Sequence, residues 1–292
     1  MRHLRWATPV ACLGVPAWLL ATRWSTTTHA HPAYLVVLVL VACAGVAAAV
    51  RPPRPRWFVL LAVALLLAPL VWLRPFPATA LAGTARTVDH ATTVELVPSE
   101  PVRDGLVFYP GARVDPRAYL RLLSPLAERG TLVVVVKAPF DFALLTPGAA
   151  EDVLDAHPDV RDWTVGGHSL GGVAAGRYAA TGDPRVRGLL LWASYPVDDL
   201  SGRADLDVWS ISGERDGFTT PADVADSRAV LPPDTRYVQV PGAVHAFFGD
   251  YGDQPGDGVP TTSRETAQEA IVAASTEALA QPRTADPGTS GR

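Results

Sequence analysis

Three side chains that together could perform nucleophilic catalysis lie in the second half of the chain. Ser169 is the centre of Gly167-His168-Ser169-Leu170-Gly171, which fits the pattern G-x-S-x-G. In that pattern a strand turns sharply into a helix and presents the serine hydroxyl at the apex, while the flanking glycines keep Cβ atoms out of the crowded turn. Asp216 and His245 follow later, each after a short apolar stretch. The spacing predicts a nucleophile, an acid and a base in the order Ser, Asp, His.

The chemistry assigns a role to each group. A serine hydroxyl is a weak nucleophile, so His245 would take its proton during attack and return it to the leaving group. Asp216 would hold the other ring nitrogen and stabilise the imidazolium. The developing oxyanion needs two backbone donors. We expect these from Leu170, directly after the nucleophile, and from Ala112 in the first strand-to-helix loop, since Pro110 has no N–H.

Other interpretations of these residues stay open. Ser169 could be an ordinary helix N-cap, and Asp216 could be only a turn residue. In that case Asp198 or Asp199, after the preceding strand, would supply the acid. His168 is expected to pack structurally, because an elbow points it away from its neighbour's hydroxyl. His245 has no comparable rival.

Short apolar stretches alternate with helical patterns from residue 92 onward. A run such as 132–136, apolar throughout, is typical of a strand that is buried on both faces. The alternation predicts a mostly parallel sheet covered by helices on both faces, with ligands at the carboxyl ends of the strands. We expect strands at 92–97 (an edge strand), 105–109, 132–136, 163–166, 186–193, 208–212 and 236–240, and helices at 116–129, 147–156, 173–180, 221–231 and 263–279.

With this order of residues, 91–280 resembles the α/β-hydrolase superfamily, especially its small, lidless, dienelactone-hydrolase-like members. The turn 212–217 around Asp216 is similar to the acid turn of that family, and 241–247 is similar to its histidine loop. The resemblance implies the α/β-hydrolase fold and a Ser169–His245–Asp216 triad.

Aromatic residues follow several of the predicted strands on the same rim as Ser169. They suggest an apolar acyl or aryl pocket, although they could equally pack the loops. The segment 194–206 is too short for a lid, so we expect an open site for a small ester or acyl substrate. No metal-ligand spacing, phosphate loop or cofactor motif occurs, so we expect no metal and no cofactor. The pocket candidates are Phe140, Phe142, Tyr195, Phe218 and Phe247.

Charge divides the chain into two parts. No acid precedes Asp89, whereas eight of the 25 basic residues do, so the front carries +8 and the remainder, with 17 basic and 29 acidic residues, carries −12. The negative remainder argues against a nucleic-acid partner. Both cysteines, Cys12 and Cys43, lie in the front part, which leaves no disulfide, zinc or cysteine-nucleophile chemistry for the rest.

The front part, 1–74, contains three apolar runs, at 6–20, 33–50 and 57–73. The second and third, of 18 and 17 residues, would each extend about 26 Å, close to the ~30 Å hydrocarbon core of a bilayer. We therefore expect two to three transmembrane helices, with buried core helices as the alternative. The remaining divisions are a linker at 75–90, a hydrolase-like domain at 91–280 and a disordered tail at 281–292.

Arginines set the expected orientation. The short link 51–56 carries three of them and should stay cytoplasmic, which places everything after Arg74 outside. The first run could instead be a cleaved signal peptide, but the later domain would still lie outside. The prediction is a multi-pass protein of the cell membrane with its hydrolase domain on the extracytoplasmic side.

The sequence thus favours a membrane-anchored serine hydrolase that cleaves carboxylic esters or thioesters. The same triad could instead serve an acyltransferase or a peptidase. A non-catalytic domain that binds an envelope partner is a third possibility. Transport by the helices has little support, because they contain no Asp, Glu or Lys.

Overall fold

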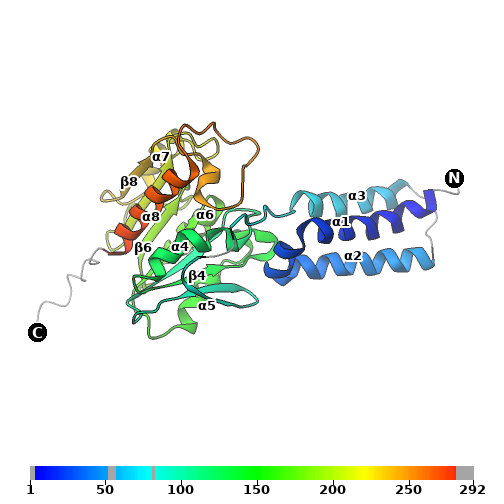
Figure 1. Ribbon diagram of the computed structural model, residues 1–292, viewed down its shortest axis with the longest axis horizontal. Coiled ribbons are helices and arrows are strands. Elements are labelled where there is room, and N and C mark those ends of the chain that lie inside the picture. Colours follow the sequence, from blue (N-terminus) through cyan, green and yellow to red (C-terminus); the bar gives the residue numbers. More distant parts are fainter. Residues whose placement is uncertain (1–3, 52–56, 81–82, 281–292) are drawn as a thin grey trace, which may run out of the picture.

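A computed structural model of the protein describes residues 4–51, 57–80 and 83–280. A bundle of three helices forms one end of the molecule and an α/β domain forms the other (Figure 1). The bundle consists of α1 (Ala7–His29), α2 (Pro32–Val50) and α3 (Trp57–Trp72), preceded by the short 3-10 helix η1 (Leu4–Trp6). The predicted disordered tail at 281–292 and most of the arginine-rich link 51–56 lie outside the described residues.

The first apolar run forms a longer helix than expected. The run was predicted to end at residue 20, but α1 continues to His29. The helix accommodates Pro16 and has one non-helical residue, Arg23. The bundle is held by its own apolar core, which includes Leu19, Leu38 and Leu70. The continuation past residue 20 is polar, and packing against α2 allows it to stay helical.

One helix among the described residues, α2, is both long and apolar enough to cross a membrane. At 16 residues, α3 is apolar but shorter, with a length of about 24 Å. The C-terminal part of α1 carries Arg23 and several hydroxyl side chains. Two to three transmembrane helices were predicted, but length and composition support only one of them, α2, among the described residues.

The domain is built on one eight-stranded sheet in the order β1-β2-β4-β3-β5-β6-β7-β8. All pairs from β4 through β3 to β8 are parallel, and β1 and β2 add antiparallel at one edge, which confirms the predicted mostly parallel sheet. The strands are β1 (Arg86–Asp89), β2 (Thr93–Val97), β3 (Asp104–Tyr109), β4 (Thr131–Val136), β5 (Trp163–His168), β6 (Val186–Trp192), β7 (Asp207–Gly213) and β8 (Arg236–Val240).

Strand β1 was not expected. It lies within the predicted linker 75–90 and takes the edge position that the sequence assigned to 92–97. Its four residues are mostly polar and exposed, so the sequence carried no apolar signal for it. Short polar edge strands are a common way to protect a sheet from pairing with other chains.

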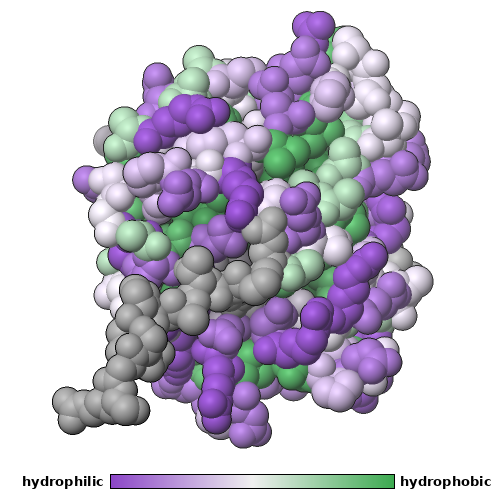
Figure 2. All heavy atoms as spheres, turned by 90° about the vertical axis from the view of Figure 1, so that its left-hand side faces the viewer, coloured by the Kyte–Doolittle hydropathy of each residue, from purple (hydrophilic) through white to green (hydrophobic). Residues whose placement is uncertain are grey.

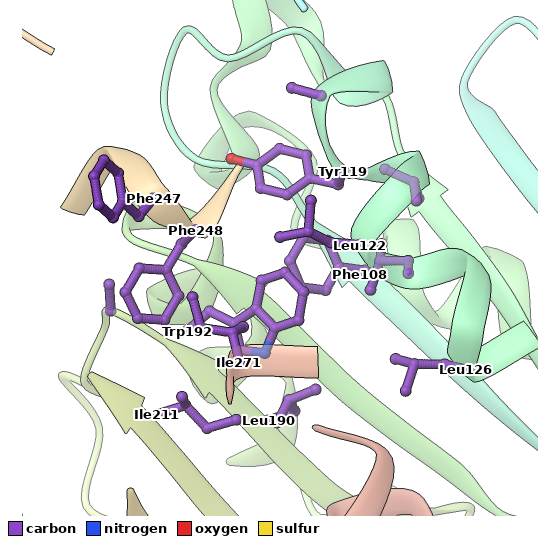
Figure 3. Close-up of a cluster of buried hydrophobic side chains, with 14 of the residues drawn as sticks. Phe108, Tyr119, Leu122, Leu126, Leu190, Trp192, Ile211, Phe247, Phe248 and Ile271 are labelled. Carbon is purple, nitrogen blue, oxygen red and sulfur yellow. The ribbon is translucent and has the colours of Figure 1, made fainter. Parts of the chain in front are cut away.

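Helices cover both faces of the sheet, as predicted. The helices α4 (Leu120–Ala127) and α8 (Arg264–Ala280) pack on one face, and α5 (Ala149–Ala156) and α6 (Leu170–Ala179) pack on the other. Figure 3 shows the core on the first face, where Leu122 and Ile271 meet the strand residues Phe108 and Trp192. The remaining helical elements are η2 (Pro116–Tyr119), η3 (Pro139–Asp141), η4 (Ala143–Leu145), α7 (Pro221–Asp226), η5 (Ser227–Val230) and η6 (His245–Phe248).

Candidate active site

Unusual backbone conformations concentrate at one edge of the sheet. Among the described residues, the non-glycine positions with positive φ are Arg113, Phe140, Asp141, Ser169 and Ala193. They follow the carboxyl ends of β3, β4, β5 and β6, which are neighbours in the sheet. Strained backbone persists only where the surrounding structure enforces it, and it gathers at functional sites. This edge is also where the sequence predicted the chemistry.

Ser169 has the backbone of a sharp strand-to-helix turn. It lies between β5 and α6 with φ 53° and ψ −125°. Its N–H donates to the Trp192 carbonyl at 3.0 Å, and its own carbonyl accepts from Ser194 Oγ at 2.7 Å. A Cβ at Gly167 would lie 2.7 Å from the carbonyl oxygen of Tyr109. The glycine of the motif is therefore needed for space, as the sequence pattern predicted.

His245 and Asp216 are in direct contact. His245 Nδ1 lies 2.8 Å from Asp216 Oδ2, and the two side chains are 2% and 0% exposed. The other carboxylate oxygen, Oδ1, accepts the N–H groups of Phe218 at 2.8 Å and Thr219 at 2.7 Å. A carboxylate that is held in this way accepts a hydrogen bond from Nδ1–H and so favours the imidazole tautomer with its proton on Nδ1. The other ring nitrogen, Nε2, is then free to accept a proton.

Within the described residues, Ser169 forms no hydrogen bond to this pair, and its neighbour in sequence, His168, contacts His245. The ring of His168, the preceding residue, is 4.6 Å from the His245 ring between centroids. The Ser169 side chain is partly exposed, and within the described residues its hydroxyl has no hydrogen-bond partner. Hydrogen bonds between catalytic groups are often long without substrate.

The two alternative acids are occupied elsewhere. Asp198 pairs with Arg177 at 3.6 Å, and Asp199 accepts the N–H of Ser201 at 2.9 Å. In the part of the chain that the structure describes, neither of them contacts His245.

The two backbone N–H groups that the sequence predicted as oxyanion donors belong to Leu170 and Ala112. Leu170 is the first residue of α6, so its N–H has no intrahelical partner. In the loop after β3, the Gly111 N–H donates to Tyr119 Oη at 2.9 Å and the Arg113 N–H donates to the Asp141 carbonyl at 2.8 Å. Ala112, between them, has no protein acceptor within the described residues.

The loop that carries Ala112 is held by a residue that sequence reasoning missed. Tyr119 Oη accepts the Gly111 N–H and lies 2.9 Å from His168 Nδ1. The one phenol oxygen thus links the Gly111 backbone to the His168 ring. Burial, and secondly the nearby His245, hold the pKa of His168 well below its ordinary value. The sequence signal was only a tyrosine in a helical segment.

Asp257 is the second missed residue. Its carboxylate accepts the N–H groups of His245 at 3.2 Å, Ala246 at 2.8 Å, Gly217 at 3.1 Å and Gly258 at 2.7 Å. It thereby ties the loop of the histidine to the turn of the acid. It stands in a Pro- and Gly-rich loop with no pattern that would single it out.

Two of the predicted pocket aromatics line a cavity of about 390 Å³ beside Ala112, namely Phe142 and Phe218. The Phe218 ring also packs edge-on against His245, with centroids 5.2 Å apart. Phe140 instead packs against the bundle, and Phe247 is core-packed at 6% exposure. Tyr195 is half-buried and does not line this cavity.

Larger cavities lie away from this edge. One of about 650 Å³ lies between α4 and α8, and one of about 480 Å³ lies beside β2, β4 and α5. None of the predicted site residues lines either of them, so cavity size is a poor guide to the site here. No group of three or more His, Cys, Asp or Glu that could hold a metal ion occurs in the described residues.

Several solved structures are similar to the domain. They include a thermophilic esterase, Est2, from Thermogutta terrifontis (15% identity, covering 67% of this chain and 91% of that chain, TM-score 0.47). Est1E from Butyrivibrio proteoclasticus is 16% identical (68% and 100% covered, TM-score 0.48). A dienelactone hydrolase-like promiscuous phosphotriesterase, P91, from metagenomic libraries is 19% identical (66% and 98% covered, TM-score 0.47).

No curated protein matches the chain. A family described as the alpha/beta hydrolase family matches residues 105–269, which is more than half of the 292 residues. The match includes β3 to β8 and the loops that carry Ser169, Asp216 and His245. The chain belongs to the alpha/beta hydrolase family.

Proposed function

We propose that this protein is a membrane-anchored serine hydrolase that cleaves carboxylic esters, with Ser169 as nucleophile, His245 as base and Asp216 as the acid of the triad. The observation that carries the proposal is the buried 2.8 Å contact between His245 and Asp216, at the same edge of the sheet as a serine in a strained turn. Burial of a charged pair is weak evidence of a role in stability. Membership of the alpha/beta hydrolase family supports a hydrolytic role for the pair instead.

The reaction has two halves. Ser169 Oγ attacks the ester carbonyl while its proton moves to His245 Nε2, and the Leu170 and Ala112 N–H groups stabilise the oxyanion. The carbon–oxygen bond to the alcohol then breaks, and the alcohol leaves with the proton from His245. Water, deprotonated by His245, attacks the acyl-serine, releases the carboxylic acid and restores the hydroxyl. A thioester would follow the same steps, with a thiol as the leaving group.

Replacement of the nucleophile tests the reaction. Ser169→Ala in the full chain, assayed in detergent with p-nitrophenyl butyrate, should lose at least about 10⁴-fold in kcat, as expected when a triad loses its nucleophile. Ser201→Ala is a matched control, because Ser201 is exposed and lies away from this edge. Unchanged turnover in Ser169→Ala would refute the assignment. Added alcohol or amine acceptors separate hydrolysis from acyl transfer by the products.

The surface of the bundle supports membrane anchoring. Fifteen of the 20 large hydrophobic side chains that are exposed among the described residues belong to residues 6–72. By contrast, the face of the domain that is turned away from the bundle is largely hydrophilic (Figure 2). A soluble protein rarely leaves so many large apolar side chains of one region open to water. We infer that the three helices enter the bilayer together, with α2 as the full span.

The arginine-rich end of the bundle favours an extracytoplasmic domain. Arg51, at the end of α2, lies at the end of the bundle that is remote from the domain (Figure 1). Cytoplasmic loops carry the excess of Lys and Arg, so the domain would face outward. A reporter fused after Arg292 that functions only outside the cytoplasm should be active. Activity of a reporter that functions only in the cytoplasm would overturn this orientation.

A further inference from the structure

The cavity beside the proposed oxyanion donor is shared by the bundle and the domain. The bundle contributes Arg23, at the kink of α1, and Trp72 and Arg74, at and just after the end of α3. The domain contributes Ala112, Phe142 and Phe218. Its volume, about 390 Å³, is within the ~300–1,000 Å³ of small-molecule sites. A ligand that fills it would contact both the bundle and the loop of Ala112.

The cavity contains cations without counter-ions. Arg23, Arg74 and Arg113 line it, and within the described residues none of them forms a salt bridge. No Asp or Glu lines the cavity either. Three arginines at one cavity are therefore left without a carboxylate partner in the described residues. Close cations with no anion raise the local potential and favour binding of an anion.

Arg113 is held in place as a preorganised donor. Its guanidinium lies over the rings of Trp72, at 4.9 Å, and Phe76, at 5.0 Å, and its buried Nε has no hydrogen-bond partner in the described residues. Burial, and secondly Arg74, lower its pKa. Asp141, whose carbonyl accepts the Arg113 N–H, forms no salt bridge to the guanidinium within the described residues, and burial raises the pKa of its carboxyl well above the ordinary value.

The cavity also lies at the level where a bilayer would end. Trp72 is the last residue of α3 and is 59% exposed, and Arg74 lies over Trp18 of α1 at 5.7 Å. Exposed tryptophans beside arginines mark the headgroup layer of a membrane. A phosphate at this level would belong to a lipid of the leaflet in which the bundle is embedded.

We propose that this cavity binds the anionic headgroup of a membrane lipid ester, so that the substrate of Ser169 is an anionic amphiphile taken directly from the membrane surface. The arginines hold the phosphate, the ester carbonyl reaches Ala112 and Leu170, and Phe142 and Phe218 contact the start of the hydrocarbon. This substrate assignment rests on the proposed hydrolase function, whereas binding of the lipid does not.

The first test compares two lipids in the full-length protein. Oleate release from dioleoyl phosphatidylglycerol and from dioleoyl phosphatidylcholine is measured at equal surface concentration in neutral detergent. We expect phosphatidylglycerol to be preferred, and Arg74→Gln and Arg113→Gln each to lower the preference ratio about tenfold through KM, as for loss of one charge-assisted contact. Arg74 is exposed, so its substitution does not threaten the fold. Arg129→Gln, an exposed arginine at the end of α4, is the matched control.

A second test separates binding from turnover. Ser169→Ala protein is titrated with fluorescent phosphatidylglycerol, and we expect binding that Arg74→Gln weakens about tenfold. Equal use of the two lipids, or a ratio that both substitutions leave intact, would overturn the proposal. Displacement of the lipid by millimolar inorganic phosphate would identify a site for free phosphate and overturn it as well. If Ser169 proves inert while the arginine-dependent binding stands, the hydrolase function fails and the anionic-lipid site survives.

Discussion

Tyr119→Phe removes one oxygen from the buried contact that holds the loop of Ala112. Tyr119 is fully buried, burial raises the pKa of its phenol, and the hydroxyl hydrogen-bonds to His168 Nδ1 at 2.9 Å. The substitution leaves the Gly111 N–H and His168 Nδ1 without partners. A buried polar group without a partner costs about 1–3 kcal/mol. Two such groups, less the desolvation of the lost hydroxyl, give a destabilisation of about 2–4 kcal/mol.

The loss of stability and the loss of turnover are measured separately. A thermal melt in detergent should show a Tm lower by about 4–16 °C, since each kcal/mol shifts Tm by about 2–4 °C in a domain of this size. The kcat on p-nitrophenyl butyrate, assayed well below Tm, should fall about 10–100-fold, which is less than the complete loss of an oxyanion donor costs. KM should change little, because the hydroxyl does not reach substrate.

Tyr178→Phe is the matched control. Its hydroxyl donates to Asp183 at 3.0 Å, at the end of α6 away from the proposed site. It should lose less than about 1 kcal/mol and keep its kcat. If Tyr119→Phe retained kcat within about twofold while folded, Tyr119 would not position the loop, and the assignment of Ala112 would lose its structural basis.

Three further substitutions test other contacts. Asp216→Asn should keep the fold and lower kcat about 10³–10⁴-fold, because the amide stabilises the wrong imidazole tautomer; a loss below tenfold would contradict its role. Asp257→Ala should lower kcat about tenfold or more and make the loop of His245 more exchangeable by hydrogen–deuterium exchange, since four N–H groups lose their acceptor. The pKa of the Asp141 carboxyl is raised in the folded protein, so the same carboxyl ionises at a lower pH in the unfolded chain. The free energy of unfolding should therefore fall as pH rises above about 4. Asp141→Asn should flatten this decrease of stability with pH in thermal melts from pH 4 to 8. An unchanged pH dependence would show that Asp141 is not its source.

The fold was accessible from sequence where the apolar pattern was strong. The six buried residues of β4 and the G-x-S-x-G turn carried their own local signals, and these predicted the parallel sheet and the edge at which Ser169 lies. The strand β1 had no such signal, because an exposed polar strand is specified by its partner and not by its own residues.

The supporting contacts of the candidate site were inaccessible for another reason. Tyr119 and Asp257 act through partners 49 and 12 residues away, His168 and His245, and such distances in sequence leave no local pattern. The aromatic rim was only a set of candidates, because sequence does not reveal which side chains face a cavity. The meeting of Arg23, Arg74 and Arg113 likewise requires the bundle and the domain to be placed together.

The proposed triad is tested most directly by covalent labelling of the nucleophile. The full-length protein is treated with a fluorophosphonate, digested and analysed by mass spectrometry. The account predicts one adduct, on Ser169, that is absent from Ser169→Ala and forms at least about 10²-fold more slowly in His245→Ala, because the hydroxyl then lacks its base. An adduct on another residue, or labelling of the folded protein that is the same with and without His245, would contradict it.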